Sequence, residues 1–182
     1  MIVIFEGPDN TGKDTQQKLL IKNYRNNYFQ VLKYSSLPFA KDDWEEHLDY
    51  STRLYNRMFA LLASSSTDFI LNRSHLGESV YSPLYRNYTG DYVFKLEENW
   101  LNLIDENEIF LIVFTNTGEE LINRDDGLSF YTNIDEAETE NEYFIRAFQK
   151  SKIKNKILIE VGTKSREEIS KEIINFIEDA RN

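Results

Sequence analysis

Two glycines and a lysine near the start of the chain stand at a spacing that suits phosphate binding. Gly7 and Gly12 bound a short polar loop and Lys13 follows directly, which is the pattern G-x-x-x-x-G-K. Small residues there let successive backbone N–H groups turn toward a phosphate chain. The lysine adds a positive charge at the β- and γ-phosphates, and the start of the next helix adds a partial one. The loop could merely join a strand to a helix, but this context favours a phosphate cradle for ATP or GTP.

The residue after the lysine departs from the usual form of this motif. A Ser or Thr hydroxyl normally stands there and reaches Mg²⁺, whereas this chain has Asp14, with Thr15 one position later. Either the Asp14 carboxylate lies near the metal and binds it more strongly, or it points away and water takes the place of the hydroxyl. The sequence leaves both interpretations open.

An acidic composition without cysteine limits the chemistry open to the rest of the chain. The 182 residues are 41% hydrophobic, which suits one domain of ordinary size. The net charge of −10 argues against a nucleic-acid partner, although a small anionic ligand in a locally basic pocket is compatible with it. Without cysteine, thiol catalysis and Cys-based zinc sites are excluded. His47 and His75 stand in no spaced ligand cluster, so we expect surface or helix residues rather than catalytic bases.

The chain also lacks the patterns of membrane and export segments. No apolar run approaches the roughly 18 residues that a membrane-spanning helix requires. Met1 leads directly into an apolar strand pattern, which leaves no room for a signal peptide. We therefore expect a cytoplasmic protein without a membrane partner.

Strands and helices alternate along the chain in a way that places the phosphate loop at one edge of a sheet. Five apolar runs predict strands, at residues 2–6, 30–34, 69–71, 109–114 and 157–161. Helical spacing of apolar residues predicts helices at residues 15–27, 42–63, about 76–85, 93–105 and 165–180. The central runs are too apolar to be half exposed, which is typical of buried parallel strands. The pattern predicts an α/β fold, a five-stranded parallel sheet with helices on both faces, as one domain over residues 1–182.

Basic residues fall near the carboxyl ends of the predicted strands, the edge where open α/β sheets bind ligands. Arg73 follows the third strand, and a loop with Pro38 at residues 35–39 follows the second. Arg53 and Arg57 lie one turn apart on a helix, and their spacing alone favours a solvated helix face.

A polar excursion at residues 123–146 separates the fourth and fifth predicted strands. Arg124 opens it, and a lone arginine there suits a mobile lid that carries a charge to a transferring phosphoryl group. The acidic residues that follow, between Asp135 and Glu142, are expected to form mostly a solvated helix surface.

Several segments, in order and correctly spaced, resemble the thymidylate kinase family of P-loop nucleoside monophosphate kinases, particularly its short phage-type members. One matching segment is the phosphate loop, Phe5-Glu6-Gly7-x-Asp9-x-x-Gly12-Lys13-x-Thr15-Gln16. Asn72-Arg73 followed by Tyr81 resembles the Asp-Arg-Tyr … Ala-Tyr-Gln segment of that family. The resemblance covers most of the chain and implies a P-loop NTPase three-layer sandwich.

The resemblance implies a role for each matching residue. The loop residues that would bind ATP are Gly7, Asn10, Thr11, Gly12, Lys13, Asp14 and Thr15, and the adenine-side loop would add Thr163 and Lys164. Arg73 would hold the acceptor monophosphate, and Tyr81 would pack beside the deoxyribose. Arg53 would contact the base, with Arg57 as its rival. Asp9 would help to hold the acceptor, and with Asp14 would organise Mg²⁺ and its waters.

Departures from the family pattern bear on the catalytic arginine and the base. Family members place a catalytic arginine in the phosphate loop or in the lid; this loop has Asn10, so Arg124 would carry that role. Asn72 replaces the usual Asp, Ser82 stands where a base-side Gln is common, and residues 35–38 lack the Arg-Glu-Pro signature. The family commonly forms homodimers, so the resemblance also implies a homodimer.

These observations predict Mg²⁺-assisted transfer of the ATP γ-phosphoryl group to a deoxynucleoside monophosphate, with dTMP or a related pyrimidine nucleotide as the expected acceptor. Lys13, Arg124 and Asp9 are the expected catalytic residues. The acceptor oxygen is already anionic near pH 7, so the reaction requires no general base.

The sequence also allows three alternative functions to be considered. A deoxynucleoside kinase is suggested by Asn72-Arg73-Ser74, which is similar to the Glu-Arg-Ser of that group, but residues 34–39 offer no carboxylate base for a neutral hydroxyl. A non-catalytic nucleotide-binding module would explain Asp14 and Asn72 as signs of decay. A nucleic-acid-acting ATPase is disfavoured by the acidic charge and by Thr115, which stands where that class has a carboxylate.

Overall fold

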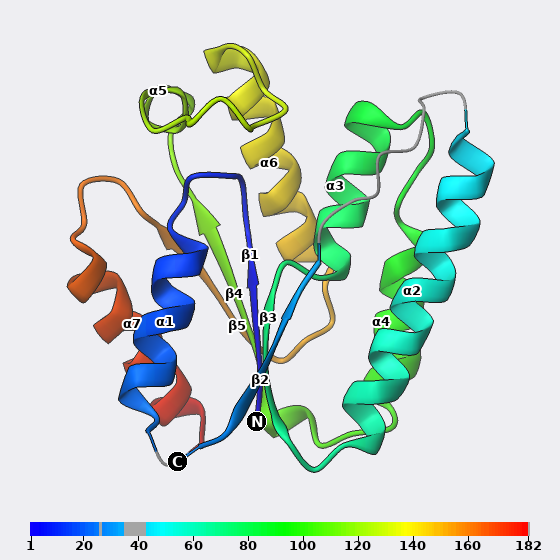
Figure 1. The fold of residues 1–182 in the computed structure, drawn as a ribbon, viewed down its shortest axis with the longest axis vertical. Coiled ribbons are helices and arrows are strands. Elements are labelled where there is room, and N and C mark those ends of the chain that lie inside the picture. The colour runs from blue at the N-terminus through cyan, green and yellow to red at the C-terminus, as the bar shows by residue number, and fades with distance from the viewer. Residues whose placement is uncertain (26, 35–42, 182) are drawn as a thin grey trace.

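The computed structural model describes residues 1–25, 27–34 and 43–181 (Figure 1). The loop predicted at residues 35–39 and the predicted helix start at residue 42 lie outside the described residues. Within the described ranges, no helix combines the length and the apolar character needed to cross a membrane.

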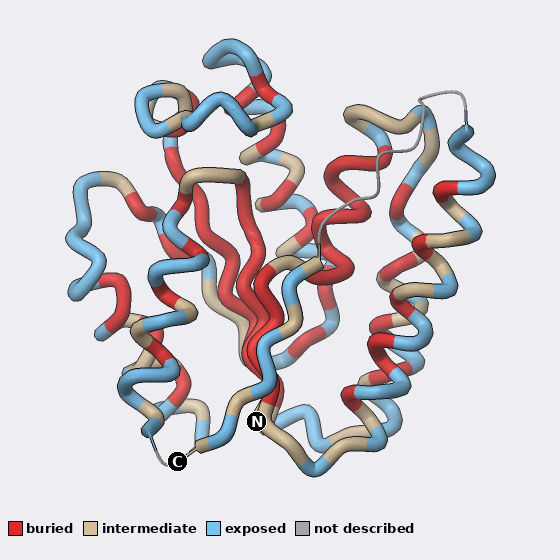
Figure 2. Tube along the Cα trace, in the orientation of Figure 1, coloured by how far each residue is buried: buried red, intermediate tan, exposed pale blue. Residues whose placement is uncertain are grey.

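Five parallel strands form one sheet in the order β2-β3-β1-β4-β5, which confirms the predicted sheet. The strands are β1 (Ile2–Glu6), β2 (Phe29–Lys33), β3 (Asp68–Asn72), β4 (Ile109–Thr115) and β5 (Asn155–Glu160). Every residue of β1 and β4 is buried, whereas the edge strands β2 and β5 are mostly half-buried or exposed (Figure 2). Continuous apolar runs mark the central strands because helices cover both of their faces.

Helices cover the two faces of the sheet unequally (Figure 1). One face carries α1 (Lys13–Asn23) and α7 (Arg166–Arg181). The other face carries α2 (Trp44–Ser64), α3 (His75–Tyr85), α4 (Tyr92–Leu101) and α6 (Ile134–Lys150). The short helices α5 (Gly118–Asn123) and η1 (Glu106–Glu108) lie at the ends of β4. The three layers enclose two apolar cores, one on each side of the sheet.

Strand alternation supplies residues to both cores. Val3 and Phe5 pack with α1 and α7, while Ile2 and Ile4 pack with the helices of the opposite face. The predicted elements are present with small shifts of their ends; helix α4, for example, ends at Leu101 rather than at the predicted residue 105.

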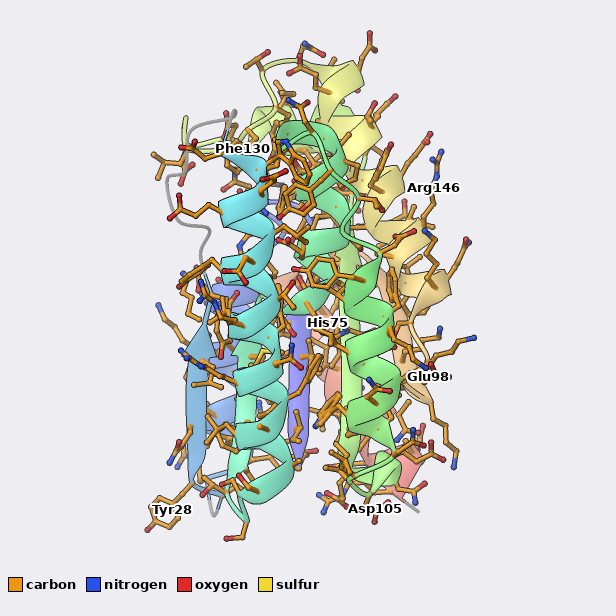
Figure 3. The ribbon with its side chains drawn as sticks, turned by 90° about the vertical axis from the view of Figure 1, so that its right-hand side faces the viewer. Tyr28, His75, Glu98, Asp105, Phe130 and Arg146 are labelled. Carbon is orange, nitrogen blue, oxygen red and sulfur yellow. The ribbon has the colours of Figure 1, made fainter. Side chains whose placement is uncertain are left out.

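Both histidines lie in helices, as expected, but neither lies at the surface. His75 lies on α3, among the helices that share its face of the sheet (Figure 3). Its ring is completely buried, and its Nε2 lies 2.7 Å from a carboxylate oxygen of Glu97. Glu97 also accepts hydrogen bonds from the Ser151 hydroxyl and the Lys152 N–H. This closed cluster ties α3 and α4 to the chain after α6, so His75 has a structural role. His47, on α2, is 4% exposed.

The acidic surface predicted between Asp135 and Glu142 lies on α6. Its acidic residues are exposed with one exception, Glu140, which is 1% exposed and faces α3. Phe144 and Ala147 continue that buried face. Much of the segment predicted as a lid is therefore a packed helix, and residues 124–133 form the irregular chain before it.

Candidate active site

The phosphate loop runs from the end of β1 to the start of α1. Gly7 has a φ of 134°, and a Cβ on it would lie 2.4 Å from the carbonyl oxygen of Phe114 on β4. Gly12 has a φ of 87° and directly precedes the first helical residue. The Thr11 hydroxyl donates to the Pro8 carbonyl at 2.9 Å and closes the loop. Both glycines are needed because a side chain would be strained at these φ values.

Lys13 lies inside this loop. Its Nζ donates to the carbonyl oxygens of Gly7, at 2.9 Å, and of Pro8. Burial lowers the pKa of Lys13 to about 7, and the nearby charge of Arg73 contributes to the shift, while Asp9 opposes it. An anion in the loop would favour the charged lysine, so the arrangement is suited to a phosphate.

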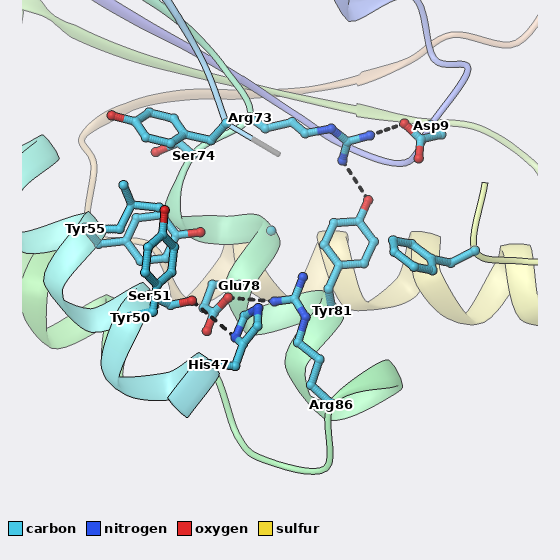
Figure 4. Close-up of a pocket in the computed structure, with 14 residues that line it drawn as sticks. Asp9, His47, Tyr50, Ser51, Tyr55, Arg73, Ser74, Glu78, Tyr81 and Arg86 are labelled. Atoms are coloured by element: carbon cyan, nitrogen blue, oxygen red, sulfur yellow. Dashed lines mark hydrogen bonds and ion pairs between the residues drawn. The ribbon is translucent and has the colours of Figure 1, made fainter. Parts of the chain in front are cut away.

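Arg73, Asp9 and Tyr81 converge beside the loop, as the prediction of a shared acceptor site requires (Figure 4). The Arg73 guanidinium donates to the Asp9 carboxylate and, at 2.8 Å, to the Tyr81 hydroxyl. Arg73 directly follows β3 and has a φ of 69°, a left-handed conformation that costs a residue with a Cβ about 1 kcal/mol. Its N–H donates to the Phe5 carbonyl at 2.9 Å, which holds it in this conformation.

A cavity of about 200 Å³ extends from this cluster between α2 and α3. Its described walls carry four tyrosines and a phenylalanine, with one arginine near the phosphate loop and another, Arg86, farther away (Figure 4). The described residues that line it are Asp9, Tyr34, His47, Tyr50, Ser51, Leu54, Tyr55, Arg73, Ser74, Gly77, Glu78, Tyr81, Arg86 and Phe130.

Arg53, the predicted base contact, is not among these described lining residues. It pairs with Asp49 at 2.7 Å on an exposed side of α2. Together with Arg57, Tyr50 and Leu54 it lines a separate hollow. The base-contacting role of Arg53 stays a prediction that this geometry does not support.

Asp14 and Asn72, the two departures from the family pattern, contact each other. The Asn72 side chain donates to a carboxylate oxygen of Asp14 at 2.6 Å, and Lys33 donates to the same oxygen at 3.0 Å. Burial opposes ionisation of Asp14, but the hydrogen bond and charge of Lys33 outweigh it and lower the pKa. The side chain stays 62% exposed beside the loop. Mg²⁺ often takes one or two carboxylates together with waters and substrate phosphates, so Asp14 fits a magnesium ligand.

The remaining predicted residues lie around the loop. Arg124 donates to the Gly162 carbonyl at 2.8 Å and pairs with Glu120, so it lies beside the predicted adenine-side loop rather than beside Asp9. Thr163 and Lys164 of that loop are exposed, and so is Thr15 in the first turn of α1.

Asn10 joins the phosphate loop to the predicted lid. Its side chain donates to Asp125 and to Ser129, each at 3.2 Å. The Tyr131 hydroxyl also donates to the Asp9 carbonyl at 3.3 Å. The irregular chain before α6 therefore rests on the loop.

Glu140 is a site residue that sequence reasoning missed. It accepts hydrogen bonds from the hydroxyls of Tyr81, at 3.2 Å, and Tyr85, at 3.1 Å. Burial raises its pKa to about 7, while these hydrogen bonds oppose the shift and the charge of Asp9 adds to it. Its position on the apolar stripe with Ala137 and Phe144 was the available signal, because a carboxylate on a buried face needs partners.

Arg86, Glu78 and His47 are further cavity residues without an assigned role in the sequence. Glu78 had the same kind of signal as Glu140, since it lies between Leu76 and Val80 of the buried face of α3. Arg86 lies just beyond α3 and had no comparable signal.

Comparison with known proteins connects this geometry to one fold. No family model matches the sequence, and no curated protein matches it. Among solved structures, the chain is similar to YorR from Bacillus subtilis in complex with phosphorylated GDP, with a TM-score of 0.70 and 19% identity over 98% of this chain and 96% of that one.

Two further solved structures are similar over nearly their whole length. Thymidylate kinase from Candida albicans has a TM-score of 0.67 and 15% identity, over 100% of this chain and 93% of that one. Deoxyadenosine kinase from M. mycoides, solved with dCMP and dCDP, has a TM-score of 0.62 and 13% identity, over 98% of this chain and all of that one. The protein has the α/β fold of the P-loop nucleotide kinases.

Proposed function

We propose that the protein transfers the γ-phosphoryl group of ATP to a deoxynucleoside monophosphate, giving ADP and the diphosphate. The supporting observation is the position of Arg73, whose guanidinium lies between the phosphate loop and the cavity, next to Asp9 and Tyr81. A cation there can align an acceptor phosphate with a donor phosphate held by the loop.

The chemistry requires positioning and charge neutralisation. An anionic oxygen of the acceptor phosphate attacks the γ-phosphorus as the bond to the β–γ bridging oxygen breaks, and ADP leaves with that oxygen. Lys13 and the loop N–H groups would hold the donor phosphates, and Arg73 would exchange Asp9 for the acceptor phosphate. Asp14 and Asp9 are the proposed ligands of Mg²⁺, which when bound would neutralise charge on the donor phosphates.

Arg124, at the start of the predicted lid, would supply a further positive charge to the transferring phosphoryl group. Arg124 now donates to Gly162, so its proposed catalytic role requires it to leave that carbonyl and turn toward the loop. Because α6 is packed against α3, we place the moving part at residues 124–133, which contact the loop through Asn10.

A deoxynucleoside kinase is the second candidate, and one observation favours it. Asp9 supplies a carboxylate at the Arg73 end of the cavity, where a neutral hydroxyl acceptor would need a base. This group lies on the phosphate loop rather than after β2, where the sequence argument looked for it.

Coupled measurement of ADP release separates the candidates. Purified protein with Mg-ATP is tested against dTMP, dUMP, dGMP, dAMP, dCMP, thymidine and no acceptor. The proposal expects turnover on at least one monophosphate and only background with thymidine. Turnover on thymidine alone would favour the nucleoside kinase, and ATP binding without turnover on any acceptor would favour a binding module.

A further inference from the structure

A second guanidinium occupies the cavity on the side away from the phosphate loop. Arg86 directly follows the last residue of α3, and its side chain is 16% exposed. Its Nη1 donates to Glu78 at 2.8 Å, and the guanidinium turns toward the cavity beside His47 (Figure 4). The cavity therefore runs from one arginine, Arg73, to another.

Glu78 accepts hydrogen bonds from Arg86 and from two tyrosines near it. The side chain is 2% exposed, and one of its carboxylate oxygens accepts from Arg86. The other oxygen accepts from the hydroxyls of Tyr88 and, at 3.0 Å, Tyr92. A carboxylate offers about four lone-pair sites, and each of these donors uses one of them, so most of the acceptor capacity of Glu78 is taken. A ligand group that reaches this end of the cavity therefore meets the guanidinium of Arg86 beside a carboxylate whose acceptor sites are mostly taken.

The neighbouring His47 contacts this side of the cavity through Tyr88. The Tyr88 hydroxyl, which donates to Glu78, also lies 2.6 Å from the Nδ1 of His47. Burial lowers the pKa of His47, and the charge of Arg86 lowers it further, although Glu78 opposes the shift. The lowered pKa disfavours the charged form of the imidazole, and the contact at Nδ1 holds Tyr88 beside Glu78.

The orientation of a nucleotide in this cavity rests on the proposed function. With the acceptor phosphate at Arg73 and the sugar at Tyr81, the base points toward Arg86. The ring position farthest from the sugar is C4 in a pyrimidine and C6 in a purine. A guanidinium has donors and no acceptor, so it binds an oxygen substituent there and leaves an amino substituent unpaired.

We propose that Arg86, held by Glu78, reads this position and selects bases that carry an oxo group there. Thymine, uracil, guanine and hypoxanthine are the favoured class, and cytosine and adenine are disfavoured. Arg86 is thus the specificity-determining residue, in place of Arg53 on the exposed side of α2.

Equilibrium binding by calorimetry tests this with two matched ligand pairs, each differing only in that oxo or amino group and the adjacent ring N–H. The wild-type chain is titrated with dUMP and dCMP, and with dIMP and dAMP, without ATP. We expect the oxo member of each pair to bind roughly tenfold or more tightly. Equal binding within both pairs, stronger binding of the amino members, or no nucleotide binding overturns the inference.

Variants locate the effect. Arg86→Met should bring each pair to nearly equal affinity, and Arg86→Gln, which keeps a donor toward Glu78, should do the same if the methionine variant does not fold. Circular dichroism and thermal unfolding report folding. Arg146→Met removes an arginine that is 61% exposed on α6 and should leave the preference unchanged. A preference that survives in a folded Arg86 variant, or that disappears in Arg53→Met instead, assigns the base to another residue.

Turnover distinguishes failure of this inference from failure of the proposed function. Oxo-selective binding without phosphorylation of any acceptor would leave Arg86 as the reading residue and remove the kinase. Phosphorylation of dCMP as efficiently as dUMP would leave the kinase and remove the reading role.

Discussion

The two halves of the candidate site are built in different ways. The donor half is a contiguous loop, residues 7–15, whose shape comes from backbone conformation at Gly7 and Gly12. The acceptor half is assembled from β3, α2, α3 and the chain before α6, and its shape comes from side chains that pair across these elements. A contiguous loop can be predicted from the sequence, whereas a cavity lined by paired side chains depends on the whole fold.

We expect the largest effects on activity when the cation of either half is removed. Lys13→Ala should lower kcat/KM on the order of a hundredfold or more and leave binding of the monophosphate intact. Arg73→Ala should lower kcat/KM by a similar factor and leave ATP binding intact, because each variant removes a preorganised charge partner from one half only. Steady-state kinetics and calorimetry with each nucleotide measure the two effects.

Exposed residues provide the controls for that pair. Lys18→Ala on α1 and Arg146→Ala on α6 remove equal charges away from the site and should keep nearly full turnover. Near-normal turnover of folded Lys13→Ala or Arg73→Ala would contradict the division into two halves.

The next effect is a pH dependence of the stability of the fold, caused by Glu140 beside the acceptor half. The folded protein keeps the Glu140 proton up to about pH 7, whereas the unfolded chain releases it near the ordinary glutamate pKa of 4.5. The folded state therefore binds more protons between these values, and stability falls as pH rises through this window, by on the order of 3 kcal/mol above pH 7. Glu140→Gln should lose this contribution to the difference in stability between pH 5 and pH 8, measured by urea unfolding, whereas Lys13, whose pKa burial lowers to about 7, contributes with the opposite sign in both proteins. An unchanged difference between the two pH values in the variant would assign the titration to another group.

A smaller effect tests backbone shape in the donor half. Gly7→Ala should destabilise the fold by roughly 2 kcal/mol more than Gly127→Ala, because both positions have positive φ but only Gly7 lacks room for a Cβ. Urea unfolding of both variants gives the difference. Equal destabilisation would mean that the close approach to Phe114 is relieved by a small shift.

The smallest effect concerns Asp14 in the donor half and its neighbour Lys33 on β2. Both side chains are more than half exposed, so a double-mutant cycle with Asp14→Asn and Lys33→Met should give a coupling below about 1 kcal/mol that decreases with salt. A weak coupling leaves the carboxylate available to Mg²⁺. A coupling well above that value would make Asp14 a structural partner of Lys33.

The outcome of the sequence predictions follows the same division. The parallel sheet, its helices and the loop were predictable because strand runs, helical stripes and the glycine spacing are local patterns. Arg73 and Tyr81 were predicted from a motif and do lie together with Asp9. Arg53 was predicted from the same resemblance and stays a prediction: it pairs with Asp49 and is not among the described residues that line the cavity, and a shift of one or two positions in a helix changes the face on which a residue lies.

The sequence by itself determined the α/β class, the phosphate loop and the arginine that follows β3, because each depends on residues close together in the chain. Only the tertiary structure decided that Arg86 is held by Glu78, that Glu140 is buried under Tyr81 and Tyr85, and that Arg124 lies on Gly162. Partners such as Tyr81 and Glu140 come from different elements, and burial sets both the pKa of a carboxylate and its need for a hydrogen bond. No local pattern contains that information, because it arises when α3 packs against α6.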